Sequence, residues 1–231
     1  MAAMTSGYRV RATLLAVVLA LFAGCGGSDG DDKGASTNSA TGTSTTAAEG
    51  GVQLGPAFDS IATLPGALKS APPWPANNAS SLQLRLRKIG LQPLREEGQV
   101  VHIHQHLDLY ANGQKATVPA EIGIDAGGGF ISDLHTHETD GILHVESPTQ
   151  RSFTLGQFFA VWGLPLDAEC IGSLCEQGAR QLRVWVNGEE VTADPTRIVL
   201  AEHQEIVIAY GSREQVPDPL PKSFDFESVG L

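Results

Sequence analysis

An alternating pattern over residues 101–110 constrains the fold of this chain more than any other feature of its sequence. Apolar and polar side chains alternate along this segment, with Gln105 as the one exception. Because side chains of a β-strand point alternately to two faces, this period of two predicts a strand. Asn112-Gly113 follows directly and favours a two-residue hairpin turn, in which both central residues take positive φ. The polar side of the strand consists of His102, His104, His106, Asp108 and Tyr110.

A second segment has the same build. Residues 182–188 align with residues 107–113, and Asn187-Gly188 stands where the first copy has Asn112-Gly113. We therefore expect two hairpins of similar construction, which either an old duplication or chance explains. Further strands are predicted over residues 205–210 and, more briefly, over residues 198–200.

Two short helices are also expected. Residues 81–89 fit a helix or a strand, and a cap at Asn78 or Ser80 with Gly90 beyond the end favours the helix. A capping box begins at Thr154 and is followed by Phe158, Phe159 and Trp162, which we assign to core packing, and Gly163 ends that helix. The predicted fold class is mainly β, a sandwich or open barrel of antiparallel hairpins with one or two short helices.

Residues 1–24 have the layout of a removable signal peptide. Arg9 and Arg11 precede a mainly apolar, uncharged run that is shorter than the roughly 20 residues a membrane-spanning helix requires. The segment ending Leu21-Phe22-Ala23-Gly24-Cys25 resembles the lipobox of bacterial lipoproteins, although Phe22 stands where that motif has Leu. The resemblance implies that Cys25 becomes a lipidated N-terminus, acylated for example with palmitate. It also implies a lipid anchor on the extracytoplasmic side of the cell membrane.

The remaining chain divides into a linker and a domain. Residues 25–51 are rich in Gly, Ser, Thr and Ala and have almost no large apolar side chain, which predicts a flexible linker. Residues 52–231 have a length that fits one domain with one core. We therefore expect a single His-rich β domain that begins at about residue 52.

The net charge limits the partners of this domain. Loss of the signal peptide removes two arginines and no acid, which takes the formal net charge from −11 to −13. A chain this acidic is unsuited to nucleic acid, and anionic lipid repels it. The lipid on Cys25 is thus the expected membrane contact, and protein partners are left open.

Cys170 and Cys175 are the only cysteines besides Cys25. In an oxidising compartment an isolated pair with this spacing is expected to close a small disulfide loop. Thiol exchange is a lesser alternative, because the spacing is not that of a CxxC redox site.

Histidines cluster in this sequence. Six of the seven lie between His102 and His144, and His203 stands apart without a predicted role. His102, His104 and His106 share one face of the first strand, because strand side chains repeat every two residues.

The second histidine group flanks Asp140-Gly141, a pair typical of type I′ turns. A hairpin around that turn places His137 opposite His144 and His135 opposite Glu146. A turn centred on Thr139-Asp140 instead pairs His135 with His144, and in both registers the four side chains share one face. A three-residue loop with a bulge would break this arrangement.

Imidazole and carboxylate side chains together suit divalent transition metals. The predicted ligands are His137, His144, His135, His102, His104 and Glu146. Zinc and copper are the expected ions. Met1 and Met4 are the only methionines and are removed with the signal peptide, which disfavours a Cu(I) carrier with thioether ligands. No Cys lies near the cluster in sequence, which disfavours a blue-copper centre.

Three segments also resemble a family of uncharacterised bacterial secreted proteins and lipoproteins. That family carries HxHxHLD, HTH and GxxHVE, which match residues 102–108, 135–137 and 141–146, and the likeness extends over about residues 80–231. The resemblance implies no particular activity but supports treating the segments as one unit. His102-x-His104 followed by Asp108 is also loosely similar to cupins, whose glycine and second-motif spacings are missing here.

The leading hypothesis is a membrane-tethered extracytoplasmic lipoprotein that captures or delivers a divalent transition metal. A second hypothesis is a metal-dependent enzyme with Glu138, Glu146 or Asp108 as general base, and the sequence leaves catalysis open. Further hypotheses are a partner-binding lipoprotein with an incidental histidine patch, a polar network without a ligand, and a pH-sensitive patch of imidazoles.

Overall fold

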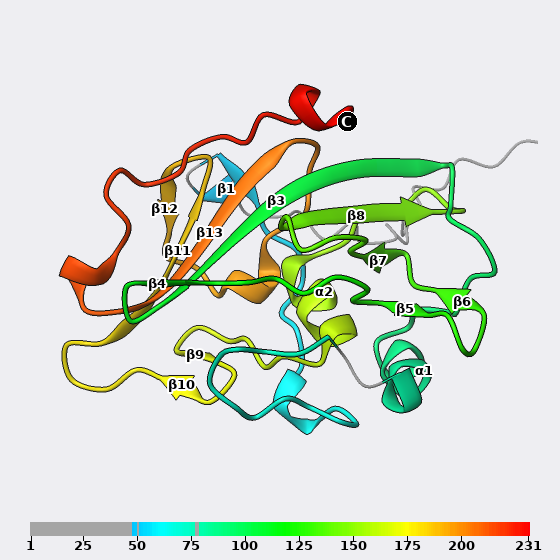
Figure 1. Ribbon diagram of the computed structural model, residues 1–231, viewed down its shortest axis with the longest axis horizontal. Helices are drawn as coiled ribbons and strands as arrows, with labels where there is room; N and C mark the ends of the chain where they lie inside the picture. The colour runs from blue at the N-terminus through cyan, green and yellow to red at the C-terminus, as the bar shows by residue number, and fades with distance from the viewer. Residues whose placement is uncertain (1–47, 50, 77–78) are drawn as a thin grey trace, which may run out of the picture. The chain divides into compact units, whose positions relative to one another are not determined.

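A seven-stranded sheet forms the centre of the computed structural model, which describes residues 48–49, 51–76 and 79–231 (Figure 1). The strands follow the order β12-β11-β13-β3-β8-β7, and β4 pairs with β3 beyond the end of β8. Their bounds are β3 Val101–Ala111, β4 Gln114–Ala116, β7 Leu134–His135, β8 Ile142–Ser147, β11 Gln181–Val186, β12 Glu189–Val191 and β13 Gln204–Gly211. The predicted signal peptide, Cys25 and most of the predicted linker lie outside the described residues, and the domain boundary stays a prediction.

The prediction of a mainly β fold with two short helices is confirmed. The sheet is open and mixed. Strand β13 runs parallel to β3, and all other pairs of neighbouring strands in the sheet are antiparallel. We expected antiparallel hairpins only and did not predict the parallel pairing of β13 with β3. All eight residues of β13 are buried, and a strand buried on both faces fits a central position between two neighbours.

Both Asn-Gly turns have the predicted geometry. Asn112 and Gly113 have φ of 53° and 81°, and Asn187 and Gly188 have φ of 52° and 84°. Each pair joins an antiparallel hairpin, β3 to β4 and β11 to β12. Of the other predicted strands, β13 covers residues 205–210, whereas residues 198–199 form only isolated bridges, to Leu54 and Thr154.

The two helices are α1 (Ala79–Lys88) and α2 (Leu155–Trp162). Thr154 and Gln157 make the reciprocal bonds of a capping box, and Gly163 ends α2 in the left-handed conformation, as predicted. Ser80 lies inside α1 and is not its cap, and Asn78 lies outside the described residues.

Smaller elements surround the sheet. They are the strand pairs β1 (Ala48–Glu49) with β2 (Val52–Gln53), β5 (Ile124–Asp125) with β6 (Phe130–Ile131), and β9 (Cys170–Ile171) with β10 (Leu174–Cys175), and the 3-10 turns Ile61–Thr63, Pro195–Arg197, Arg213–Gln215 and Glu227–Val229. The predicted disulfide between Cys170 and Cys175 is confirmed and closes the β9–β10 hairpin. Within the described part of the chain, no helix combines the length and apolar character needed to cross a membrane.

One face of the sheet carries the main core. Leu107 and Leu109 of β3 pack there with α2, whose Phe158, Phe159 and Trp162 are fully buried. The prediction that this aromatic group serves core packing is confirmed, and Trp162 also donates a hydrogen bond to the Pro75 carbonyl. In Figure 1, α2 lies directly below the sheet.

The opposite face of the sheet is polar over β3, β8 and β7 and has a small apolar group over β11 and β13. Trp185, Val207 and Ala209 form that group, and Val216 and Leu220 of the C-terminal segment pack against it. Farther along this segment, Phe224 stacks on His106, with ring centroids 4.1 Å apart. The C-terminal segment, orange to red in Figure 1, thus covers part of the face that carries the histidines.

Candidate metal centre

The register of the β7–β8 hairpin brings the two histidine strands together. His135 lies opposite His144, and on the other side of β8 His104 lies opposite His144 and His102 opposite Glu146. The shared face predicted from the sequence is therefore present. The register with His137 opposite His144 is wrong, and the second predicted register, which pairs His135 with His144, is the one observed.

The side chain of Asp140 explains the difference in register. Its Oδ1 accepts a hydrogen bond from the Ile142 amide, and Asp140 does not take the positive φ of a type I′ turn. Gly141 does have positive φ, and a Cβ on it would lie 2.7 Å from the Leu107 carbonyl oxygen. The loop is therefore fixed by its contact with β3 rather than by the turn preference of Asp-Gly.

Four side chains form the first donor set, which consists of His135, His137, His144 and Glu146. One donor atom from each lies within 4.8 Å of the other three. The His135 Nε2–His137 Nε2 and His144 Nδ1–Glu146 Oε1 distances are both 3.2 Å. Around a tetrahedral zinc ion with bonds of about 2.0–2.1 Å, neighbouring donors lie about 3.3 Å apart. Two of the donor pairs therefore already have the spacing of neighbouring ligands around a zinc ion.

The hydrogen bond of His135 orients its ring for coordination. Its Nδ1 lies 3.0 Å from the Ser132 carbonyl oxygen, and since a carbonyl oxygen only accepts, Nδ1 carries the proton. Burial lowers the pKa of His135 to about 3, so the neutral ring presents a bare lone pair on Nε2. A backbone carbonyl that fixes the tautomer in this way is typical of metal-binding histidines.

The second donor set is His102, His104 and Glu146, again with all donor atoms within 4.8 Å of one another. His102 Nε2 lies 3.3 Å from Glu146 Oε1. Burial, and to a smaller extent the neighbouring His144 and His102, lower the pKa of His104 to about 4. His104 is 7% exposed, and its Nε2 has no hydrogen-bond partner among the described residues. It is therefore a neutral imidazole with an unused polar atom.

Glu146 belongs to both sets. It is 3% exposed, and Oε1 receives the contacts of His102 and His144. Burial by itself raises the pKa of Glu146, but the hydrogen bond from His144 and the electrostatic interactions with the neighbouring histidines together bring it below the usual value. Oε2 is buried and has no hydrogen-bond partner in the described part of the chain. The carboxylate is therefore ionised and has one oxygen free to bind.

A third group of donor atoms belongs to His106, Asp108 and Glu205, and in this group Glu205 Oε1 is buried without a hydrogen-bond partner among the described residues. His106 contacts the Asp140 carbonyl through Nε2 at 3.0 Å and Glu205 through Nδ1 at 2.8 Å. Lys115 forms an ion pair with Asp108 at 2.6 Å. Burial raises the pKa of Glu205, even though the hydrogen bond from His106 acts against this. Both ring nitrogens of His106 thus contact protein oxygen atoms, whereas His104 Nε2 of the second set has no partner among the described residues.

Two of the acids around the histidines were missed in the sequence. Glu97 lies 3.4 Å from His137 Nε2, and Glu205 pairs with His106. Glu205 was detectable as the one charged residue of the apolar segment 205–210, whereas Glu97 gave no signal. Glu138, a predicted general base, belongs to none of the three groups and is exposed.

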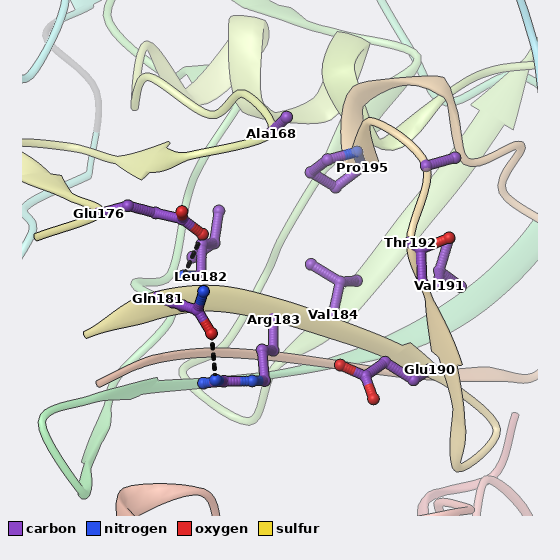
Figure 2. Close-up of a pocket in the computed structure, with 11 residues that line it drawn as sticks. Ala168, Glu176, Gln181, Leu182, Arg183, Val184, Glu190, Val191, Thr192 and Pro195 are labelled. Atoms are coloured by element: carbon purple, nitrogen blue, oxygen red, sulfur yellow. Dashed lines mark hydrogen bonds between the residues drawn. The ribbon is translucent and has the colours of Figure 1, made fainter. Parts of the chain in front are cut away.

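A surface pocket of about 240 Å³ lies at the other edge of the sheet, against β11 and β12. Figure 2 shows Val184 and Pro195 at its wall, together with a hydrogen bond between Gln181 and Arg183. Glu176, which also lines the pocket, accepts a hydrogen bond from the Leu182 amide. None of the lining residues belongs to the histidine sets, so the pocket is separate from the candidate metal centre.

No protein-family model, curated protein or solved structure matches this chain. The resemblance seen in the sequence stays a prediction.

Proposed function

We propose that this domain binds a divalent transition metal through His135, His137, His144 and Glu146. The observation that carries the proposal is the convergence of three imidazoles and one carboxylate within 4.8 Å. Three nitrogen donors and one oxygen donor suit a tetrahedral zinc ion, and copper(II) accepts the same ligand types. Zinc is therefore the first ion to test and copper the second.

An ion accounts for a polar atom that the protein itself leaves without a partner. Glu146 Oε2 is buried without a hydrogen-bond partner among the described residues. An unpaired buried polar group costs about 1–3 kcal/mol, and a metal in contact with this carboxylate removes that cost.

The hypothesis of a pH-sensitive patch is less well supported. Such a patch needs imidazoles that gain protons near neutral pH. Burial holds the pKa of His135 at about 3 and that of His104 at about 4, so both rings stay neutral at physiological pH. Neutral imidazole is the form that binds a metal.

We further propose that the domain meets its ion outside the cytoplasmic membrane, tethered by lipid on Cys25. The signal-like segment 1–24 and the lipobox-like residues that end at Cys25 support this location. His137 and His102 are 41% and 44% exposed, which gives an external ion access to the donor sets. Capture or delivery of the metal at the membrane surface fits these features.

Elemental analysis of the purified chain tests metal binding. We expect about one tightly bound ion per chain and its loss in His137→Ala, which changes an exposed side chain and spares the core. His203→Asn is the matched control, because His203 is exposed, lies outside all three groups and has a positive φ that Asn tolerates. Negligible metal in the wild type, or equal metal in wild type and His137→Ala, would refute the proposal.

A separate experiment tests the location. Mass spectrometry of the mature N-terminus should find acyl chains on Cys25, and Cys25→Ser should move the chain from the membrane fraction to the soluble fraction. An unmodified cysteine, or an unchanged distribution in Cys25→Ser, would contradict lipid anchoring without affecting the metal proposal.

A further inference from the structure

The donors of the candidate metal centre form two sets that have only Glu146 in common. His135, His137 and His144 belong to one, and His102 and His104 to the other. Four rings form a continuous array over β3, β8 and β7, with centroids 4.9 Å apart for His102–His104, 4.7 Å for His104–His144 and 5.2 Å for His135–His144. The fifth ring, His137, follows β7 and lies 4.6 Å from His144.

A single ion does not use all of these donors. Ligands of one zinc ion lie no farther apart than twice the bond length, about 4.2 Å. Among the described residues, donor atoms that lie within even 4.8 Å of one another form the two separate sets rather than one set of six. An ion in the first set has four protein ligands, which complete a tetrahedral shell. Such an ion does not bind His102 or His104.

We propose that His102, His104 and Glu146 bind a second ion, and that the Glu146 carboxylate bridges the two. This inference rests on the proposed function of the first set. The bridging residue is 3% exposed, contacts both sets through Oε1, and has an unpartnered Oε2 within the described part of the chain. His104, whose Nε2 is likewise buried and unpartnered there, belongs to the second set. A carboxylate that gives one oxygen to each ion holds two ions about 3.5–4 Å apart.

The two positions differ in their surroundings and therefore in how firmly they hold an ion. The inner set includes His135, which is fully buried, and its four ligands close the shell. The outer set has three protein ligands, one of them the 44% exposed His102, so a tetrahedral ion there keeps one position for water or an external ligand. Because the second ion also meets the charge of the first across a shared carboxylate, the outer ion binds more weakly and exchanges first.

Native mass spectrometry of the metal-free full chain during zinc titration tests this inference. We expect two zinc ions per chain, with the second bound at least about tenfold more weakly than the first. His102→Ala should bind one ion with the affinity of the inner site, whereas the control His203→Asn should bind two. Near-ultraviolet circular dichroism of each variant confirms that the fold is retained.

Copper(II) provides an independent readout of the bridge. Two Cu²⁺ ions held by one carboxylate couple magnetically, so the electron paramagnetic resonance signal at two equivalents should be broadened or lost in the wild type. His102→Ala should give the spectrum of an isolated Cu²⁺ ion at one equivalent. One ion per chain in both proteins would overturn the two-ion inference and leave the proposed function intact, whereas no bound ion would refute the proposed function itself.

Discussion

The metal-free domain should lose stability in acid because of His135. This side chain is fully buried, and its Nδ1 bonds to the Ser132 carbonyl oxygen. Burial lowers its pKa from 6.5 to about 3. Between these two values the unfolded chain binds a proton on His135 and the folded chain does not, so the free energy of unfolding falls as the pH falls through this window.

The size of the effect follows from the two pKa values. One pKa unit corresponds to about 1.36 kcal/mol, and a change from about pH 7 to about pH 4.5 crosses roughly two units of the window, which gives a loss of about 2.5 kcal/mol from His135. Urea unfolding of the metal-free chain, followed through the fluorescence of buried Trp74 and Trp162, measures this loss.

A non-titrating variant isolates the contribution. The Asn amide of His135→Asn can still donate to the Ser132 carbonyl but does not titrate, so the variant should lack about 2.5 kcal/mol of the acid-dependent change. His203→Asn should keep the full change, because His203 is exposed. An identical pH dependence in the wild type and His135→Asn would show that His135 is not held neutral by burial.

Three further predictions concern the metal, the core and the disulfide. Zinc at about 100 times its dissociation constant should raise the free energy of unfolding by about 2.7 kcal/mol, and a thermal shift assay that finds no stabilisation in the wild type would contradict binding to the folded state. Gln105→Leu should stabilise the chain by about 1 kcal/mol in urea unfolding, because Gln105 is fully buried and its amide has no hydrogen-bond partner within the described residues; a loss of stability would show that the amide is satisfied. Joint replacement of Cys170 and Cys175 by Ser should cost about 2 kcal/mol, the chain-entropy value for so short a loop, and unchanged stability would mean that the loop is ordered without its bond.

Features decided by neighbouring residues were accessible from the sequence. The strand at residues 101–110, both Asn-Gly turns and the capping box of Thr154 depend on side-chain period, backbone preference or bonds across a few positions. The six predicted metal ligands also came from local spacing, because alternation along a strand already fixes which side chains share a face.

Only the tertiary structure decided which of these side chains meet. The β7–β8 register depends on the Asp140 side chain and on the contact of Gly141 with β3, and a shift of register changes every pairing along a hairpin. The parallel pairing of β13 with β3 brings Glu205 to His106 across 99 positions of sequence, and no local pattern specifies so distant a partner. The sequence alone thus determined the kinds of donor and the faces they occupy. Long-range packing decided that they form two sets around Glu146, because burial and strand order are properties of the whole sheet.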